Sequence, residues 1–349
     1  MGRVALEEAP AAEIDAVEVA RLRHAVGQLS CLAASYDKHH AHLRNGAVVA
    51  YRVAAGVCVV AGDPLASDAD APRAIAEFTA ACRAQRRAVC FMQTRPSLRG
   101  AYRDAGLRVL GFGEEPMVDL PGFDLAAPRR ANLRHELARA ARAGLRAEVL
   151  PWGEAGAATW AELRPVSDAW LRARPWPELW FSVGRFGDTL DPGGLLTVVR
   201  DAQGVAQAFT TWLRLGESGL ALDMFRRRPG APPGAMDLCI TATLERARER
   251  GLAVASLGIA PFRESPANAH QRAGGRVANG VRGALFRHGT LGYDYRSLSR
   301  FKDKFAPRWE PRDVAVSRGP RALAIPVALA VVHFRAPRVD QNQRGRRVH

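Results

Sequence analysis

The sequence predicts a mixed α/β fold with two lobes, and two observations support this prediction. The chain has 349 residues, enough for about two ordinary domains, and its 48% hydrophobic content fits a globular protein with a sizeable core. The order helix, strand hairpin, strand, helix and strand is read twice, before and after about residue 150. Because no repeat is visible residue by residue, the prediction of two copies of one α/β unit depends on element order.

The first half contains signals that separate its elements. Asn45-Gly46 predicts a turn at the start of a strand hairpin, and Gly62-Asp63-Pro64 ends that hairpin. Asp70 followed by Pro72 predicts the start of a helix. In order, we expect a helix, a strand hairpin, a helix, a buried strand, a helix and a pair of strands, over about 13–34, 45–64, 72–85, 88–93, 97–106 and 107–120.

A basic helix is expected over 129–150, where leucines and alanines repeat every four residues. Arg139, Arg142 and Arg146 occur at i, i+3 and i+7, so they share another face of that helix. Such a stripe is typical of a solvated helix face. It also fits a ridge that contacts the phosphates of a nucleic acid.

The second half repeats the order of the first. We expect a helix, a strand hairpin, a strand that leads into a basic loop, a helix and a strand, over about 154–173, 195–215, 219–230, 235–250 and 252–258. An apolar segment, 323–334, then lies between arginines. This segment fits either a terminal helix packed on the body of the protein or an element that lies on a membrane surface.

The charge balance indicates an anionic partner. Fifty basic residues against 35 acidic ones give a net charge of +15, which suits nucleic acid, an acidic membrane surface or a phosphorylated substrate. A GC-rich gene, which enriches Arg and Ala, is the competing explanation. The N-terminus has no apolar signal core, and no window of about 18 apolar residues exists. We therefore expect no transmembrane segment and a cytoplasmic protein, with attachment to the inner face of the membrane left open.

Several familiar chemical signatures are missing from the chain. It has no phosphate-binding G-x-x-x-x-G-K-[ST] loop, no H-E-x-x-H and no G-x-S-x-G. The histidines of HHAH, 39–42, lack a partnering cysteine or acid pattern, and the five cysteines have no zinc spacing. We therefore expect no metal and no cofactor, and we expect reduced, mostly buried thiols.

Asp223 is the first candidate functional residue. It lies in the predicted strand LDMFRRRP, 222–229, just before three arginines. A carboxylate on a strand is costly to bury alone, so Asp223 either pairs with one of these arginines or binds a cationic group of a ligand. Two nearby stretches suit ligand binding: FSVGRF, 181–186, with Gly184 and Arg185, and the turn PPGAMD, 232–237, which opens a helix.

Lysine usage singles out the stretch RFKDKFAPRWEPR, 300–312. The chain has only three lysines, Lys38, Lys302 and Lys304, and two of them lie in this stretch. An exposed charged helix face is the simple interpretation. An ammonium, however, is a compact charge where a guanidinium is a wide planar fork, so a site at a phosphate or a developing oxyanion favours lysine.

Seven motifs, in this order, resemble the catalytic C-terminal domain of phosphatidylglycerol lysyltransferase, also called multiple peptide resistance factor or lysylphosphatidylglycerol synthase. The similarity extends over about 35–335. The motifs are GDPLA (62–66), GEEPMVDLPGF (113–123), ANLRHELARAARAGL (131–145), FSVGRF (181–186), LDMFRRRPGAPPGAMD (222–237), LGIAPF (257–262) and RFKDKFAPRWEPR (300–312).

The resemblance implies a tandem acetyltransferase-like (GNAT) fold and the transfer of an amino acid from an aminoacyl-tRNA to a hydroxyl of phosphatidylglycerol. The lysyl or alanyl group is the one transferred, in a tunnel that tRNA and lipid enter from opposite sides. The family's acid and arginine map onto Asp223 and Arg226, and its late lysine maps onto Lys304. The chain has no convincing pyrophosphate loop for acetyl-CoA, which favours another acyl donor.

The expected site and domain limits follow from these motifs. We expect Asp223, Arg226 and Lys304 to be catalytic. We expect substrate contacts from Arg185, Arg227, Asp237, Lys302, Arg300 and Glu310, and tRNA contacts from Arg139, Arg142 and Arg146. The expected division is an N-terminal lobe over 1–150, a C-terminal lobe over 151–335 and a basic disordered tail over 336–349.

One departure from the family leaves the acceptor open. Membrane-embedded relatives carry a multi-helix flippase region, which this sequence lacks. The acceptor is therefore phosphatidylglycerol reached at the membrane surface, or else a soluble molecule of a biosynthetic pathway. Two further functions compete with aminoacyl transfer: a non-catalytic module that binds tRNA or membrane, and an ordinary CoA-dependent acetyltransferase.

Overall fold

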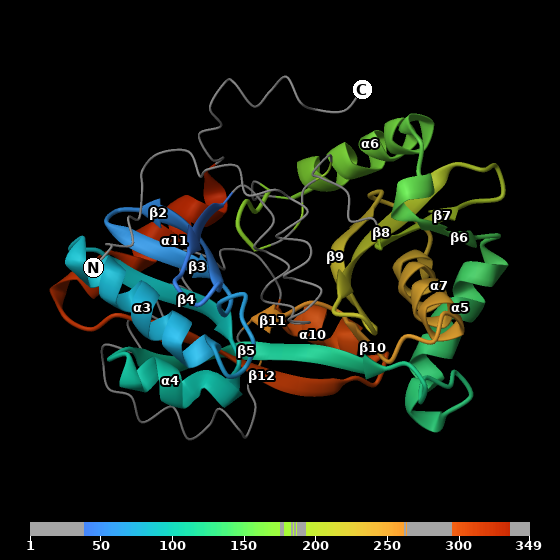
Figure 1. The fold of residues 1–349 in the computed structure, drawn as a ribbon. Coiled ribbons are helices and arrows are strands. Elements are labelled where there is room, and N and C mark those ends of the chain that lie inside the picture. Colours follow the sequence, from blue (N-terminus) through green and yellow to red (C-terminus); the bar gives the residue numbers. More distant parts are fainter. Residues whose placement is uncertain are drawn as a thin grey trace.

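A computed structural model describes residues 38–174, 178–182, 184, 186, 193–261, 263 and 295–335. The helix expected over 13–34 and the tail over 336–349 lie outside the described residues. Within them, the strands form a twelve-stranded sheet in the order β1-β2-β3-β4-β12-β5-β10-β9-β8-β7-β6, with β11 paired to β5 (Figure 1). The strands are β1 His39–His42, β2 Val48–Ala54, β3 Val57–Ala61, β4 Ala88–Thr94, β5 Arg108–Asp119, β6 Arg146–Pro151, β7 Leu195–Arg200, β8 Ala206–Leu215, β9 Gly219–Arg227, β10 Val254–Ser256, β11 Ala260–Pro261 and β12 Arg308–Val316.

The strands on the two sides of the central pair, β12–β5, follow the same pattern of parallel and antiparallel pairing. The pairs β3–β4 and β10–β9 are parallel, and the neighbouring pairs on both sides are antiparallel. Each half contributes an antiparallel meander, a helix and a parallel strand. The last strand of each half of the sequence lies beside strands of the other half. β12, from the second half, pairs with β4, and β5, from the first half, pairs with β10. The predicted mixed α/β fold with two copies of one unit is therefore confirmed.

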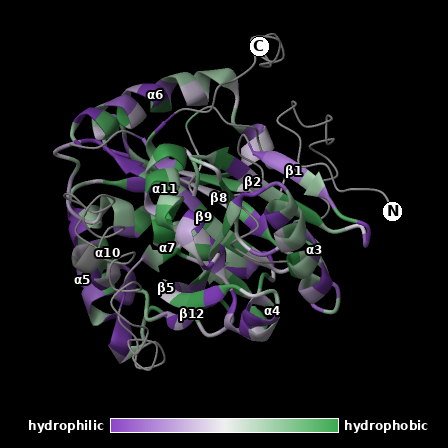
Figure 2. Ribbon diagram, turned by 90° about the vertical axis from the view of Figure 1, so that its left-hand side faces the viewer, coloured by the Kyte–Doolittle hydropathy of each residue, from purple (hydrophilic) through white to green (hydrophobic). Residues whose placement is uncertain are grey.

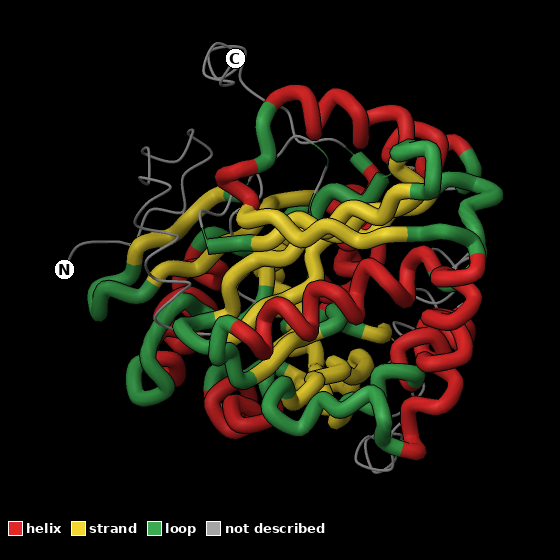
Figure 3. The backbone as a smooth tube through the Cα atoms, turned by 90° about the vertical axis from the view of Figure 1, so that its right-hand side faces the viewer, coloured by secondary structure: helices red, strands yellow, loops and turns green. Residues whose placement is uncertain are grey.

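Helices cover both faces of the sheet (Figure 3). In the first half, α3 (Ala71–Ala84) and α4 (Arg99–Asp104) pack on one face and α11 (Ile325–Phe334) on the other. Alternate residues serve the two cores: Cys58 and Val60 of β3 face α3, whereas Val57 and Val59 face α11. In the second half, α7 (Ala235–Glu249) and α5 (Ala131–Arg142) cover one face and α6 (Ala157–Arg172) the other.

Two predictions about local structure are wrong. The helix expected over 129–150 ends at Arg142, and Arg146 begins strand β6. Gly144 has φ +70°, a left-handed conformation that ends helices, and the residues after it pair with β7. The strand pair expected over 107–120 is the single long strand β5. It stays continuous because β12 pairs with it from Arg308 to Val316.

Candidate active site

The second half of the sheet opens at the point where β9 and β10 separate. These parallel strands pair only between Gly219–Ala221 and Val254–Ser256, whereas β9 continues to Arg227. The backbone of β9 beyond Ala221 therefore has no β10 neighbour. Ligands of α/β proteins commonly bind beyond the carboxyl ends of parallel strands. In Figure 1, β9 and β10 lie near the centre of the molecule, close to α10 (Tyr295–Asp303).

Asp223 lies in a β-bulge at this opening. In the β8–β9 register, Thr211 is opposite Met224 and Trp212 is opposite Leu222, so Asp223 is the extra residue. The bulge changes the phase of the strand. As a result Asp223 and Arg226, three positions apart, both contact the segment 178–184. We call the described residues of this segment, 178–182 and 184, the strap.

The carboxylate of Asp223 is held by two neutral donors. Gly184 N donates to Oδ1 at 2.9 Å, and Thr211 Oγ1 donates to Oδ2 at 3.1 Å. A Cβ atom at position 184 would overlap this carboxylate, so the strap approaches Asp223 as closely as it does because residue 184 is glycine. These contacts fix the orientation of the carboxylate.

Arg226 is buried and holds the strap from the other side. Its guanidinium forms an ion pair with Glu178 and a hydrogen bond with Ser167 of α6, and it lies 5.3 Å from the ring centroid of Trp170. Arg226 thus pairs with an acid in a distant motif, a partner that the sequence pattern around Asp223 does not reveal. Arg227, the next residue, is exposed.

Lys304 forms an ion pair with Asp237 in the first turn of α7. Its Nζ also lies 4.5 Å from the ring centroid of Phe301, and the fully buried Phe305 anchors this part of the chain. Burial raises the pKa of the Asp237 carboxyl, and the Lys304 ammonium opposes that rise. The structure therefore brings two predicted site residues from distant motifs into direct contact.

Lys302 points elsewhere and is buried. Its Nζ donates to the carbonyls of Gly258, at 2.7 Å, and Ile259, at 3.0 Å, just after β10 ends. Burial lowers the pKa of Lys302 to about 7, which the nearby carboxylate of Glu115 partly offsets. A Cβ built on Gly258 would lie 3.6 Å from the carbonyl oxygen of Leu222, so Lys302 holds the segment after β10 beside the backbone of β9.

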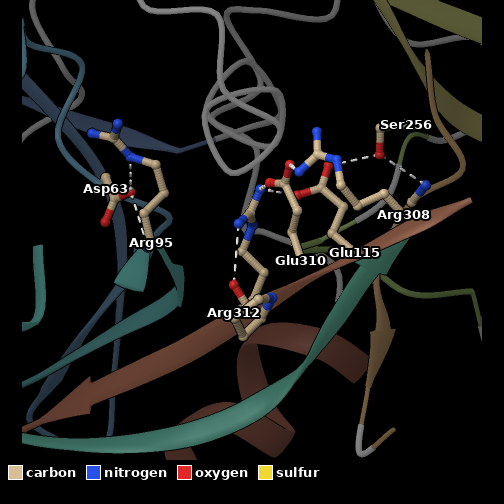
Figure 4. Close-up of polar contacts among 9 residues, drawn as sticks. Asp63, Arg95, Glu115, Ser256, Arg308, Glu310 and Arg312 are labelled. Carbon is tan, nitrogen blue, oxygen red and sulfur yellow. Dashed lines mark hydrogen bonds and ion pairs between the residues drawn. The ribbon is translucent and has the colours of Figure 1, made fainter. Parts of the chain in front are cut away.

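A charged cluster that the sequence did not predict lies on the central β5–β12 pair (Figure 4). Glu115 and Glu310 are directly opposite each other, an arrangement that is costly for like charges. Arg312 lies between them, forming an ion pair with Glu115 and lying 3.2 Å from Glu310. Ser256 Oγ donates to Glu115 at 2.7 Å and accepts from Gly258 N at 3.1 Å, so the cluster extends to the Lys302 contacts.

Glu115 is completely buried, and burial raises the pKa of its carboxyl while Arg312 opposes that rise. The signal that would have found this cluster is the acidic pair in GEEPMV, because two acids in an apolar strand require partners. Of the predicted residues, only Glu310 belongs to this cluster, where it also pairs with Arg308.

The remaining predicted residues lie apart. Arg300 is exposed on α10, and Arg185 lies outside the described residues. Arg139 pairs with Glu136 on α5, whereas Arg142 is exposed at the end of that helix. Because Arg146 belongs to β6, the three arginines expected on one helix face do not form one stripe. In Figure 1, α5 lies at the outer edge of the molecule beyond α7.

The described residues contain neither a metal-binding cluster nor a membrane-spanning helix. No group of three or more His, Cys, Asp or Glu side chains within these residues is arranged to hold a metal ion. The described helices are also each too short or too polar to cross a bilayer.

Comparisons with known proteins point to one family. The model of a family described as phosphatidylglycerol lysyltransferase, C-terminal, matches residues 19–316. The lysylphosphatidylglycerol biosynthesis bifunctional protein LysX of Mycobacterium avium (strain 104) is 29% identical over 285 residues, which are 81% of this chain and 24% of LysX. LysX of Mycobacterium marinum is 29% identical over 266 residues, which are 76% of this chain and 24% of that protein. The chain thus spans about a quarter of the length of the curated relatives it matches.

Solved structures agree with this similarity. The C-terminal domain (DUF2156) of a putative lysylphosphatidylglycerol synthetase from Agrobacterium fabrum has a TM-score of 0.78 and 29% identity, covering 93% of this chain and 100% of that one. L-PGS from Bacillus licheniformis has a TM-score of 0.76 and 25% identity, covering 93% of this chain and 97% of that one. FemX, at 9% identity and a TM-score of 0.56, shares the fold alone.

Proposed function

The chain belongs to the family of phosphatidylglycerol lysyltransferase C-terminal domains, and from this premise we propose that it is an aminoacyltransferase. It takes an aminoacyl group from an aminoacyl-tRNA and esterifies it to a glycerol hydroxyl of phosphatidylglycerol. The family match over 19–316 is the observation that carries this proposal. Lysine is the first amino acid to test, since the matching relatives are named for lysylphosphatidylglycerol.

The proposed reaction exchanges one ester for another. The acceptor hydroxyl oxygen attacks the carbonyl carbon of the aminoacyl ester while its proton passes to a base. The tetrahedral oxyanion then collapses, and the terminal ribose oxygen of the tRNA leaves with a proton. Because the donor is already activated, the protein has to position both substrates, accept a proton and stabilise the oxyanion.

We assign these tasks to residues of β9 and of the stretch after α10. We assign Asp223, which Gly184 and Thr211 orient, to binding the α-ammonium of the aminoacyl group or to accepting the hydroxyl proton through a water. The ammonium of Lys304 supplies a compact positive charge for the oxyanion or the leaving oxygen. Arg227, exposed at the end of β9, is the residue of this strand that we assign to a phosphate.

The roles of two predicted residues change in this proposal. Arg226 and Lys302 are buried and already bound to Glu178 and to backbone carbonyls. We assign them to positioning: Arg226 holds the strap over Asp223, and Lys302 holds the chain after β10. Arg139, Arg142 and Arg146 remain proposed outer contacts for the tRNA acceptor arm.

The test is transfer of radiolabel from charged tRNA into lipid. The protein is incubated with phosphatidylglycerol vesicles and either labelled lysyl-tRNA or labelled alanyl-tRNA, and lipid is extracted into organic solvent. Label in the lipid phase is expected with one of the two donors, and Asp223→Ala abolishes it. Glu249→Gln, which changes an exposed carboxylate on α7, serves as the control and keeps full transfer.

Two outcomes would contradict the proposal. The first is an absence of label in lipid with both donors. The second is transfer from acetyl-CoA under the same conditions, which would favour an ordinary acetyltransferase. Label that appears in the aqueous phase only when a soluble hydroxyl compound is added would favour a soluble acceptor instead.

A further inference from the structure

The outward face of the C-terminal helix is apolar. Leu323, in the 3-10 turn Pro320–Ala324, is 75% exposed, and Val327 in α11 is 58% exposed. They are the two most exposed large hydrophobic side chains in the described parts of the chain. The inner face of the helix is buried against β2, β3 and β4, so it already has its partner. Figure 2 shows α11 coloured as hydrophobic over most of its length.

Positive charge surrounds these two side chains. Arg318 and Arg321 precede Leu323 and are both exposed, and Arg335 at the other end of α11 is exposed as well. The whole chain carries a net charge of +15. Apolar side chains flanked by cations match the interfacial region of an anionic leaflet, where the headgroups are negative and the acyl chains begin.

We propose that Leu323, Val327, Arg318 and Arg321 form a docking face that binds the surface of an anionic phospholipid bilayer. This inference deepens the proposed function and rests on it, since it states how the lipid acceptor is reached. The two apolar side chains insert below the headgroups while the two guanidiniums bind lipid phosphates. Two exposed apolar side chains are too small an area for a stable protein interface, which typically buries about 800 Å² on each partner.

The strap connects the docking face with Asp223. Trp180 N donates to the carbonyl of His333 at 2.9 Å, and the ring of Phe181 meets the ring of His333 edge-on at 5.3 Å. Four residues after Trp180, Gly184 contacts the Asp223 carboxylate. The helix that carries the docking face thus also holds the segment that orients the proposed catalytic acid.

The hydrogen bonds of His333 between the strap and α11 require a neutral imidazole ring. His333 Nδ1 lies 2.8 Å from the carbonyl of Leu329, which can only accept, so Nδ1 carries the proton. Nε2 then accepts from Ser182 Oγ at 3.0 Å. Burial lowers the pKa of His333 to about 4, so the ring stays neutral and keeps both bonds.

Vesicle binding tests the docking face directly. The full chain is sedimented with vesicles of phosphatidylglycerol mixed with phosphatidylcholine, and compared with the double variant Leu323→Asp/Val327→Asp. We expect the double variant to bind at least about tenfold more weakly, because it replaces insertion by charge repulsion. Val205→Asp, which changes a 45% exposed valine at the turn between β7 and β8, should bind as the unaltered chain does.

Transfer assays with two forms of the acceptor separate docking from chemistry. On vesicles, the double variant should lose transfer in proportion to its lost binding. On water-soluble, short-chain phosphatidylglycerol below its micelle concentration, it should transfer at the rate of the unaltered chain. If the unaltered chain transfers to neither form, the proposed function fails, while the vesicle measurement still decides the docking face.

Three results would overturn the inference. One is equal vesicle binding by the double variant and the unaltered chain. Another is an equal loss of binding in Val205→Asp, which would show a general effect of charge. The third is a dimer in lipid-free solution that the double variant converts to monomer, since the face would then be an interface between two copies.

Discussion

Gly184→Ala perturbs the proposed catalytic acid without touching it chemically. A Cβ atom at this position would overlap both oxygens of the Asp223 carboxylate. To relieve the overlap, the carboxylate or the strap has to move by about 1 Å, and a misplacement of that size costs about 100-fold in rate. We therefore expect kcat/KM for aminoacyl transfer to fall by about 100-fold, or about 2.7 kcal/mol in the barrier.

The stability of the protein should change much less. The variant weakens one hydrogen bond, from Gly184 N to Asp223, which is worth about 1 kcal/mol. The two effects are separated by measuring kcat/KM with labelled aminoacyl-tRNA and the free energy of unfolding by urea titration. Gly156→Ala is the matched control, since Gly156 has extended backbone at the start of α6 and no atom within 4 Å of a built Cβ.

Two results would contradict the role of Gly184 beside Asp223. If Gly184→Ala keeps the kcat/KM of the unaltered chain while Asp223→Ala is inactive, the orientation supplied by the strap is irrelevant to the acid. If Asp223→Ala is itself fully active, Asp223 does not belong to the site.

Three further predictions concern stability. Burial lowers the folded-state pKa of Lys302 to about 7, so between pH 7 and 9 the unfolded chain holds a proton that the folded chain has released. The free energy of unfolding, measured by urea titration relative to Lys302→Met, should therefore rise by up to about 1.4 kcal/mol per pH unit. A difference between the two proteins that does not change with pH would refute this. Gly234→Ala should cost about 2 kcal/mol, because φ is +83° and the new Cβ meets the backbone of α5; Gly230→Ala, with φ +79° and open space, should cost less. Arg99→Met should lower the free energy of unfolding by about 3 kcal/mol, because it leaves the buried carboxylate of Asp313 without the guanidinium that binds it at 2.5 and 2.9 Å. Adding Asp313→Asn should restore most of this stability. An equal loss in the double variant would contradict the ion-pair explanation.

Local signals in the sequence predicted most elements of the fold correctly. The turn at Asn45-Gly46 precedes β2, and α7 begins at Ala235, as the turn residues and periodicity indicate. The helix prediction over 129–150 was wrong because its pattern continues across a boundary. Apolar residues after Gly144 keep a helix-like spacing, but they pair with β7 in the sheet.

Local sequence signals could not predict that β5 and β12 each pair with strands of the other half of the chain. Nothing near Glu115 or Arg312 in the sequence shows that these strands cross between the halves, because strand order depends on contacts between residues about 200 positions apart. The charged cluster on this pair was missed for the same reason. Its acids were visible, but their partners were not.

The sequence by itself determined the family and the repeated α/β unit, and it singled out the stretch with two lysines as a candidate site. Only the tertiary structure decided what each lysine does. Residues two apart on a helix point about 200° away from each other, and Lys304 lies just past the end of α10. Lys302 is therefore buried against the carbonyls of Gly258 and Ile259, whereas Lys304 reaches Asp237 in the first turn of α7. The scarcity of lysine singles out both residues equally, because composition carries no information about where a side chain points in the folded chain.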